Sequence, residues 1–419
     1  MGPVKLSIAL WMMASVSASA QAVCAVHGAA DGKTLDTVAI QKAIDDCAGK
    51  GVVKLAGTAT FLSGPLQLKS HTVLDIAPGT TLEASENHDD YAAMQIFREK
   101  GLTPLLLAKN AEDITIRGGG IIDGRGESWW ETMSSPDLRP RLIVFDHVKH
   151  VLMEDVTVQN SPSWQIVPYY SEDLTFRNMK ILAPIRDPHR TDSHRLDGRN
   201  TDGIDPFSSK RVLIDHVLID TGDDNVAIKS GQPGSPGPDD PSEDIHIVDC
   251  TFLHGHGLSV GSEVSGGVRR LRVERVSFNG TTQGIRIKSG RDRGNDVSDF
   301  VYKDITMENV GIAIQITEYY GSPRGVNGAN ATQDPVTRLT PHFHDFTIEN
   351  VKVTGAKVAM EVDGLPEAPI ERVELKNVTI DADHGATIRN ATVNSEGLVI
   401  HALTGLSIMA GPGAKGSMK

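Results

Sequence analysis

The sequence has few aromatic residues, few cysteines, no excess of positive charge and no long apolar run. After residue 22 no stretch approaches about 18 consecutive apolar residues, so we expect no membrane-spanning helix and no membrane partner. Lys and Arg number 41 against 54 Asp and Glu, which gives a formal net charge of -13. A nucleic-acid partner bound through bulk positive charge is therefore disfavoured, and any polyanion must meet a local basic patch.

Only three cysteines are present. Cys24 and Cys47 flank one short N-terminal segment and could form a disulfide in an oxidising compartment, although the spacing alone leaves this open. Cys250 lies within an apolar strand pattern, which favours a small buried hydrophobic role over that of a nucleophile.

Residues 1–22 have the pattern of an export signal. Lys5 provides a basic start, Leu6–Val16 is apolar, and Ala20 and Ala22 close small-residue cleavage sites. The apolar run is too short to span a membrane. The alternative, a buried N-terminal strand or helix, has no following periodicity to support it. We expect a secreted, extracellular protein whose signal is cleaved near Ala20 or Ala22.

A short repeat organises the remaining residues, 23–419. Each copy has apolar residues at alternate positions, a polar pair, and a second alternating apolar pair, which is the pattern of a strand with one buried face. The copies are irregularly spaced, as in a solenoid with constant strands and variable turns. We therefore predict one all-β domain, a right-handed single-stranded parallel β-helix. The nine copies begin at Ile114, Val151, Leu174, Val212, Ile245, Leu271, Phe300, Phe346 and Val373.

One helix is predicted before these repeats, from Asp36 to Cys47. Its apolar positions Ile40, Ile44 and Cys47 follow helical spacing, and Asp36 is a suitable N-cap. We expect this helix to cover the open N-terminal end of the solenoid, whose strand edges would otherwise invite aggregation. No linker suggests a second domain, and the Pro, Gly and Asp-rich stretch 232–242 is interpreted as a turn insertion.

Four consecutive coils carry more polar residues than strands with a purely structural role would need. Successive segments are separated by roughly one coil, and residues at matching phases of neighbouring coils lie about 4.8 Å apart. Taken singly, each residue has an ordinary structural interpretation as a turn or solvated charge. Their coincidence on adjacent coils instead predicts one surface, here called the polar strip, formed by Asp202, Asp223, Asp224, His256, Arg286 and Lys288.

The polar strip has the groups that glycoside hydrolysis requires, a carboxylic acid for the leaving oxygen and a carboxylate for the attacking water. Asp223 and Asp224 are neighbours, so both can serve only if the chain bends, which Gly222 permits. Arg286 and Lys288 alternate onto one face and suit a substrate that carries carboxylates. Asp205, three residues after Asp202, is expected to be structural.

The four segments resemble the signatures of the polygalacturonases, a family of pectin-cleaving glycoside hydrolases with a pectin-lyase-like parallel β-helix. The matching segments occur complete and in order at Asn200–Asp202, Gly222–Asp224, Gly255–Gly257 and Arg286–Lys288, and the likeness extends from about Gly28 to Ile388. The bacterial branch is the most similar. The resemblance implies an inverting acid/base hydrolase of polygalacturonate or pectin, with no cofactor and no metal, and we expect a monomer.

The resemblance also implies roles for individual residues. Asp223 corresponds to the general acid, Asp202 and Asp224 to the pair that holds and deprotonates water, and His256 to a group that tunes the acid. Substrate binding falls to Asn200, Arg286, Lys288 and Tyr319, with Arg286 and Lys288 on the uronate carboxylate. Tyr320 is a competing assignment for the cleft tyrosine.

Several alternatives remain open at this point. The long basic segment Arg186–Leu196 could extend the rim of the cleft or close one end of it; the length of the chain favours internal cutting over release from a chain end. Trp129, Trp130 and Trp164 are candidates for sugar stacking or for packing. More remote alternatives are a rhamnogalacturonan hydrolase, a calcium-dependent pectate lyase, and a non-catalytic polysaccharide-binding β-helix such as an adhesin.

Overall fold

The computed structural model describes residues 22–96, 99–132, 139–183, 198–234, 238–323 and 326–417. The export signal up to Gln21 and the basic segment Arg186–Leu196 lie outside these residues, so both remain predictions. Within the described ranges, no helix is both long and apolar enough to cross a membrane.

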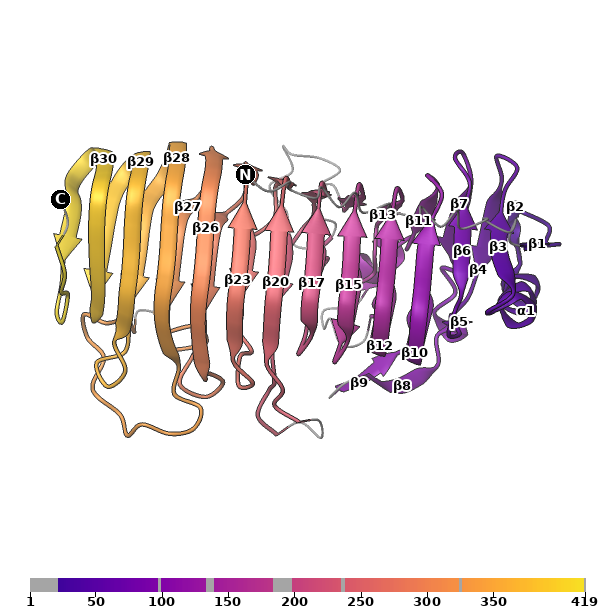
Figure 1. Ribbon diagram of the computed structural model, residues 1–419, viewed down its shortest axis with the longest axis horizontal. Coiled ribbons are helices and arrows are strands. Elements are labelled where there is room, and N and C mark those ends of the chain that lie inside the picture. The colour runs from indigo at the N-terminus through magenta and orange to yellow at the C-terminus, as the bar shows by residue number, and fades with distance from the viewer. Residues whose placement is uncertain are drawn as a thin grey trace, which may run out of the picture.

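The chain winds into an elongated solenoid of short strands that pair in parallel from coil to coil (Figure 1). The predicted parallel β-helix is thereby confirmed. One small antiparallel pair, β8 (Ala93–Ile96) and β9 (Glu99–Leu102), stands apart from the main sheet. Two short helical segments lie between strands, η1 (His88–Asp90) and α2 (Glu127–Thr132).

Each coil crosses three faces, and the first face carries the longest strands. These are β1 (Ala22–Ala25), β3 (Gly51–Leu55), β6 (Val73–Ile76), β10 (Leu106–Arg117), β12 (Ile143–Glu154), β15 (Glu172–Arg177), β17 (Lys210–Asp215), β20 (Ser242–Val248), β23 (Val268–Glu274), β26 (Asp296–Glu308), β28 (His342–Asp363), β29 (Ile370–Arg389) and β30 (Ala391–Ala410). β10, β12 and the last four of these strands also extend onto other faces.

The other two faces are built from shorter strands. The second face contains β2 (Asp31–Leu35), β4 (Thr60–Ser63), β7 (Thr81–Ala84), β11 (Ile121–Asp123), β13 (Thr157–Gln159), β16 (Lys180–Leu182), β18 (Leu218–Asp220), β21 (Thr251–Leu253) and β24 (Ser277–Asn279). The third face contains β5 (Leu66–Leu68), β14 (Ile166–Tyr169), β19 (Val226–Ile228), β22 (Leu258–Val260), β25 (Gln283–Lys288) and β27 (Ile312–Thr317).

The repeat found in the sequence is the register of the first face. The opening residues of all nine copies are successive pairing partners, from Ile114 opposite Val151 through to Phe346 opposite Val373. All nine are buried and belong to one apolar core that runs along the solenoid. Stacking thus buries a continuous row of side chains that no single coil could bury alone.

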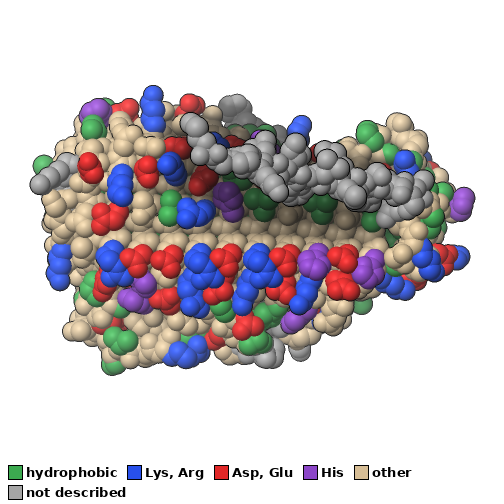
Figure 2. Space-filling view, in the orientation of Figure 1, with side chains coloured by type: hydrophobic (Ala, Val, Ile, Leu, Met, Phe, Trp, Pro, Cys, Tyr) green, Lys and Arg blue, Asp and Glu red, His purple; other side chains and the backbone are tan. Residues whose placement is uncertain are grey.

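A row of charged side chains crosses the first face immediately before these buried residues (Figure 2). Each member has a positive φ near 55–60°, a left-handed turn that tolerates Asp but costs other residues some free energy. Acidic and basic residues largely alternate along the row. In two of the pairs, Asp173 with Arg211 and Asp244 with Arg270, the carboxylate Oδ1 lies 2.6 Å from the arginine Nε. The row comprises Asp113, His150, Asp173, Arg211, Asp244, Arg270, Asp299, Asp345 and Arg372. Such a network favours the observed stacking register over a slipped one.

The predicted helix is present as α1 (Thr37–Cys47), at the N-terminal end of the solenoid (Figure 1). Its buried residues, Ile40, Ala43, Ile44 and Cys47, join the main core. Asp36 occupies the N-cap position, but its side chain makes no capping hydrogen bond. Its carboxylate instead accepts the backbone N–H groups of Ala29 and Ala30, because the preceding loop folds over it.

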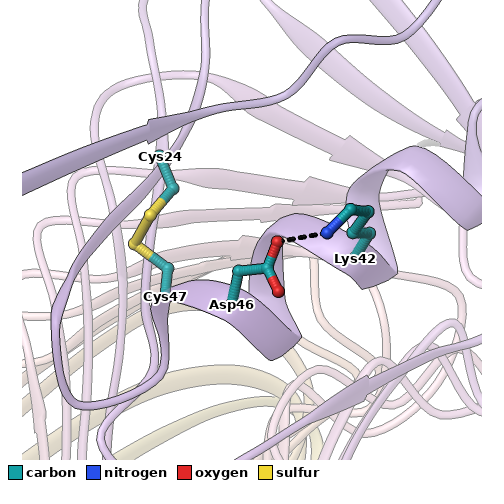
Figure 3. Close-up of a disulfide and its surroundings, with 4 residues drawn as sticks. All are labelled: Cys24, Lys42, Asp46 and Cys47. Carbon is teal, nitrogen blue, oxygen red and sulfur yellow. Dashed lines mark hydrogen bonds and ion pairs between the residues drawn. A yellow bond between two sulfur atoms is a disulfide. The ribbon is translucent and has the colours of Figure 1, made fainter.

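A disulfide joins Cys24 to Cys47 and ties β1 to the last turn of α1 (Figure 3). This resolves the pairing that the spacing left open. Cys250 is free and buried, as predicted.

We expect removal of this disulfide to lower the unfolding free energy of the protein without altering the polar strip. The double substitution Cys24→Ala and Cys47→Ala should cost about 3 kcal/mol of unfolding free energy, because a loop of this length loses its constraint in the unfolded chain. Chemical denaturation measures the change, and Cys250→Ala serves as the control for loss of a buried thiol. An unchanged unfolding free energy in the double variant would contradict the assignment.

Candidate active site

The polar strip lies on the outer surface of the third face, where β19, β22 and β25 pair in sequence. Val226, Leu258 and Ile285 are register partners and point into the core. Residues that alternate with them, including Ser259 and Arg286, which pair directly, face outward. Leu258 pairs with Ile285, so Lys288 lies further along β25 than the position opposite His256, and its side chain reaches Asp224 from there.

Asp224 is the centre of the polar strip. Its Oδ2 lies 2.7 Å from Lys288 Nζ, and its Oδ1 lies 3.4 Å from Arg286 Nη1. The Ser259 hydroxyl donates a hydrogen bond to the same Oδ1 at 2.7 Å. Burial alone would raise the pKa of Asp224, but Lys288, Arg286 and Lys229 together hold the pKa well below its ordinary value. Asp224 is therefore a carboxylate throughout the ordinary pH range.

Asp223 lies beside it and is more accessible, with 18% of its side chain exposed. His256 Nδ1 is 2.9 Å from Asp223 Oδ1 and 3.8 Å from Asp224 Oδ1. The backbone N–H of Asp224 donates to Asp223 Oδ1, so the chain bends and brings both neighbours to one surface. The predicted bend at this point is thus present.

Asn200 approaches the other oxygen of Asp223, with 3.4 Å between its Nδ2 and Asp223 Oδ2. Its own Oδ1 accepts a hydrogen bond from Arg139 Nη2 at 2.8 Å. Arg139 is buried and also donates to the carbonyls of Pro162 and Arg199. The arginine therefore orients the amide of Asn200 toward the strip. The sequence carried no sign of this role, because Arg139 lies outside every repeat and motif.

Asp202 and Asp205 are both buried next to these groups. Burial, followed by the charges of Asp205 and Asp223, raises the pKa of Asp202 well above its ordinary value. Burial likewise raises the pKa of Asp205 to about 8, against the opposing charge of Lys229. The sequence-based expectation that Asp205 is merely structural misses this electrostatic link. Both Asp205 oxygens and Asp202 Oδ1 are buried without a hydrogen-bond partner in the described part of the chain.

Asp223, Asp224 and His256 present three potential metal-ligand atoms within 4.8 Å of one another. Lys288 and Arg286 already occupy the Asp224 carboxylate, however, and two fixed positive charges disfavour a cation at that position. The arrangement suits an anionic ligand group beside the carboxylates better than a metal ion.

Two adjacent tyrosines follow β27, and they have different surroundings. Tyr319 is buried, at 8% exposure, and its hydroxyl donates to the carbonyl of Gly364. Tyr320 is 39% exposed, and its ring centre lies 5.1 Å from Lys288 Nζ and 5.7 Å from Arg286 Cζ. The geometry therefore favours Tyr320, the competing assignment, over Tyr319 as the tyrosine next to the polar strip.

Two of the three tryptophans considered for sugar stacking have other contacts. Trp129 and Trp130 are buried; Trp129 stacks on His88, and Trp130 donates its indole N–H to the carbonyl of Ser161. Trp164 is partly exposed, with Arg141 Cζ and Lys229 Nζ within 4.6 and 5.3 Å of its ring centre. Trp129 and Trp130 therefore have a packing role, and of the three tryptophans only Trp164 is still a candidate for sugar stacking.

Residues 33–397 match the model for glycosyl hydrolases family 28. The chain belongs to this family. The polygalacturonase resemblance based on the four motifs is thereby confirmed, and the chain is a glycoside hydrolase of polygalacturonase type.

Individual family 28 relatives show how far the likeness extends. The chain is 33% identical over 379 residues to an endo-polygalacturonase of Pectobacterium carotovorum, covering 85% of this chain and 87% of the relative. It is 27% identical to an exo-poly-alpha-D-galacturonosidase of Dickeya chrysanthemi, covering 80% of this chain and 62% of that protein. The solved polygalacturonase from Erwinia carotovora superposes with a TM-score of 0.73 at 31% identity, over 90% of this chain and 97% of that structure.

The two tyrosines can be separated by substitution. Tyr320→Ala should raise KM for polygalacturonate by about 5-fold, because it removes an aromatic face from Lys288 and Arg286. Tyr319→Phe, which removes only the buried hydroxyl, should cost about 1 kcal/mol of stability and leave KM unchanged. Steady-state kinetics and thermal unfolding of both variants provide the measurements. A higher KM for Tyr319→Phe with an unchanged Tyr320→Ala would reverse the assignment.

The raised pKa of Asp205 predicts that the stability of the protein depends on pH. Its folded pKa of about 8 exceeds the ordinary value of 3.8, so between these values the folded state holds a proton that the unfolded chain has released. Stability should therefore fall as pH rises from about 4 toward 8. Asp205→Asn removes this contribution, so its unfolding free energy should decline less than that of the parent between pH 4.5 and 8. Equal declines would show that Asp205 is not protonated in the folded protein.

Proposed function

We propose that the chain cuts internal α-1,4-galacturonosidic bonds of polygalacturonate and pectin, by an inverting acid/base reaction. The observation that carries this proposal is the pair Asp224 and Asp223. One carboxylate is held ionised by Lys288 and Arg286, and the other lies against His256 at a more exposed position. Hydrolysis of a glycosidic bond needs these two complementary carboxyl groups.

Asp223 acts as the general acid in this proposal. Its carboxyl is the most exposed of the three site aspartates and can reach the oxygen of a sugar lying along the strip. His256 and Asn200 each contact one of its oxygens and so orient the proton-donating group. When the bond breaks, the acid's proton passes to the leaving oxygen and Asp223 becomes a carboxylate.

Asp224 acts as the base that takes a proton from water, with Asp202 holding that water beside it. The low pKa of Asp224 keeps it ionised, while the raised pKa of Asp202 leaves it protonated at mildly acidic pH and able to donate a hydrogen bond. Water attacks the anomeric carbon from the face opposite the departing oxygen, which inverts the configuration. Activity should accordingly be highest below neutral pH.

Arg286 and Lys288 bind the carboxylate of the uronate next to the cut bond. Both cations contact Asp224, whose single negative charge balances one of their two positive charges. A uronate carboxylate that binds beside them would balance the other. A neutral sugar at this position would gain nothing from the pair, which disfavours a rhamnogalacturonan substrate. The same two charges disfavour the calcium ion that a pectate lyase would require.

Internal cutting is favoured by the relatives. The endo-acting relative from Pectobacterium is more similar than the exo-acting relative from Dickeya, and the match covers a larger share of its length. The Cys24–Cys47 disulfide is consistent with the proposed export and extracellular location. We further propose that residues 23–419 act as one domain and as a monomer.

Substitution of the proposed acid tests this reading. Asp223→Asn should lower kcat on polygalacturonate by about 10²–10⁴-fold, because the amide cannot supply the proton. Asp220→Asn is a matched control, since Asp220 Oδ1 also lies 2.9 Å from a histidine, His254, but on the second face. The control should retain activity within about 2-fold. Near-parental turnover by Asp223→Asn would exclude its role as the acid.

A further inference from the structure

A second cluster of titratable side chains lies on the first face, on strands other than those that carry the polar strip. Asp296 is the first residue of β26, and His342 and His344 are the first and third residues of β28. Asp296 pairs with His342 in register, and Ser298 pairs with His344. The side chains therefore come from two adjacent, paired strands, both labelled in Figure 1.

The potential ligand atoms of this cluster converge. His344 Nε2 is 2.9 Å and His342 Nδ1 is 3.6 Å from the same oxygen, Asp296 Oδ1. All three ligand atoms lie within 4.8 Å of one another, and the imidazole ring centres are 4.3 Å apart. Ligand atoms around a tetrahedral zinc ion, at about 2.0–2.2 Å from the metal, are about 3.3 Å apart. The two measured separations bracket that value.

The surroundings hold two of these side chains in place. His344 Nδ1 lies 2.6 Å from Asp345 Oδ2, so the ring can donate there and direct its Nε2 lone pair toward Asp296. Asp296 Oδ2 accepts a hydrogen bond from the Ser298 hydroxyl at 3.1 Å, which leaves Oδ1 for the cluster. Hydrogen bonds of this kind, in which a ligating histidine donates to a carboxylate or a ligating carboxylate accepts from a hydroxyl, orient the ligands of metal sites.

Among the described residues, the neighbouring arginines pair with carboxylates other than Asp296. Arg372 Nη2 is 3.0 Å from His344 Nδ1, on the side of the ring that faces Asp345, and it also donates to Asp345 Oδ2. Arg269 Nε lies 3.4 Å from Glu243 Oε1, on the neighbouring strand β20. A metal-free alternative exists, in which a protonated His344 bridges Asp296 and Asp345. That alternative gives no role to His342, although the centre of its ring lies 4.3 Å from that of His344.

We propose that Asp296, His342 and His344 bind a divalent transition metal, with Zn²⁺ the best match to two imidazoles and one carboxylate. Half of the His342 side chain is exposed, so water can complete a fourth position. The ion would join β26 to the start of β28, where the chain returns after the long connection that follows β27. Its role would be to stabilise the solenoid, separately from the chemistry of the polar strip.

Zinc titration of the chelator-treated, dialysed full-length protein tests the proposal. Calorimetry with ZnCl₂ should detect one site whose occupation raises Tm, and CaCl₂ at the same concentration should have no such effect. His342→Asn, at a position where 52% of the side chain is exposed, should weaken zinc binding at least about 10-fold. Activity on polygalacturonate should stay at the parental level in this variant, which shows that it folds and separates this test from that of the proposed function.

His216→Gln is the matched control, because His216 also lies in an exposed cluster with two carboxylates, Asp215 and Asp249. Its zinc affinity and zinc-dependent Tm should equal those of the parent. Three results would overturn the proposal: no heat and no change in Tm with zinc, an unchanged response in His342→Asn, or loss of the response in His216→Gln.

Discussion

A buried contact between opposite charges, from Lys288 Nζ to Asp224 Oδ2 at 2.7 Å, is the interaction on which the site depends. Neither side chain is more than 5% exposed, so each would be costly to bury without the other. The contact keeps Asp224 ionised while burial moves the pKa of nearby Asp202 in the opposite direction. Asp224 is thus available as the proposed base, and Asp223, the proposed acid, lies beside it with its Oδ1 2.9 Å from His256 Nδ1.

The solenoid makes this contact possible because it holds distant segments at constant spacing. β19, β22 and β25 belong to successive coils, and their inward residues are fixed by one continuous apolar core. The charged row on the first face reinforces the same register from outside. Slippage of one coil by one residue would turn the outward residues of that coil inward and dismantle the polar strip. The precision of the site is thus a property of the stacked coils rather than of any one loop.

Much of this arrangement was predictable from the sequence, for an identifiable physical reason. Period-two alternation reports which side of a strand is buried, and so the nine repeats predicted the strands and their register. The features that the sequence did not predict depend on contacts between segments that are distant in the chain. The electrostatic role of Asp205 could not be recognised in the sequence, because its pKa depends on burial and on the charge of Lys229. The contacts of Arg139, and the different surroundings of Tyr319 and Tyr320, follow no periodic pattern.

The most direct test of the account is incubation of the purified protein with polygalacturonic acid in excess chelator, while viscosity, reducing ends and ultraviolet absorbance are followed together. Internal hydrolysis at the polar strip predicts a rapid fall in viscosity, a slower rise in reducing ends, and no new absorbance from unsaturated products. Release of reducing ends with little change in viscosity would retain the chemistry but contradict internal cutting. Absorbance from unsaturated products, or activity only after calcium is restored, would contradict the roles assigned to Asp202, Asp223 and Asp224.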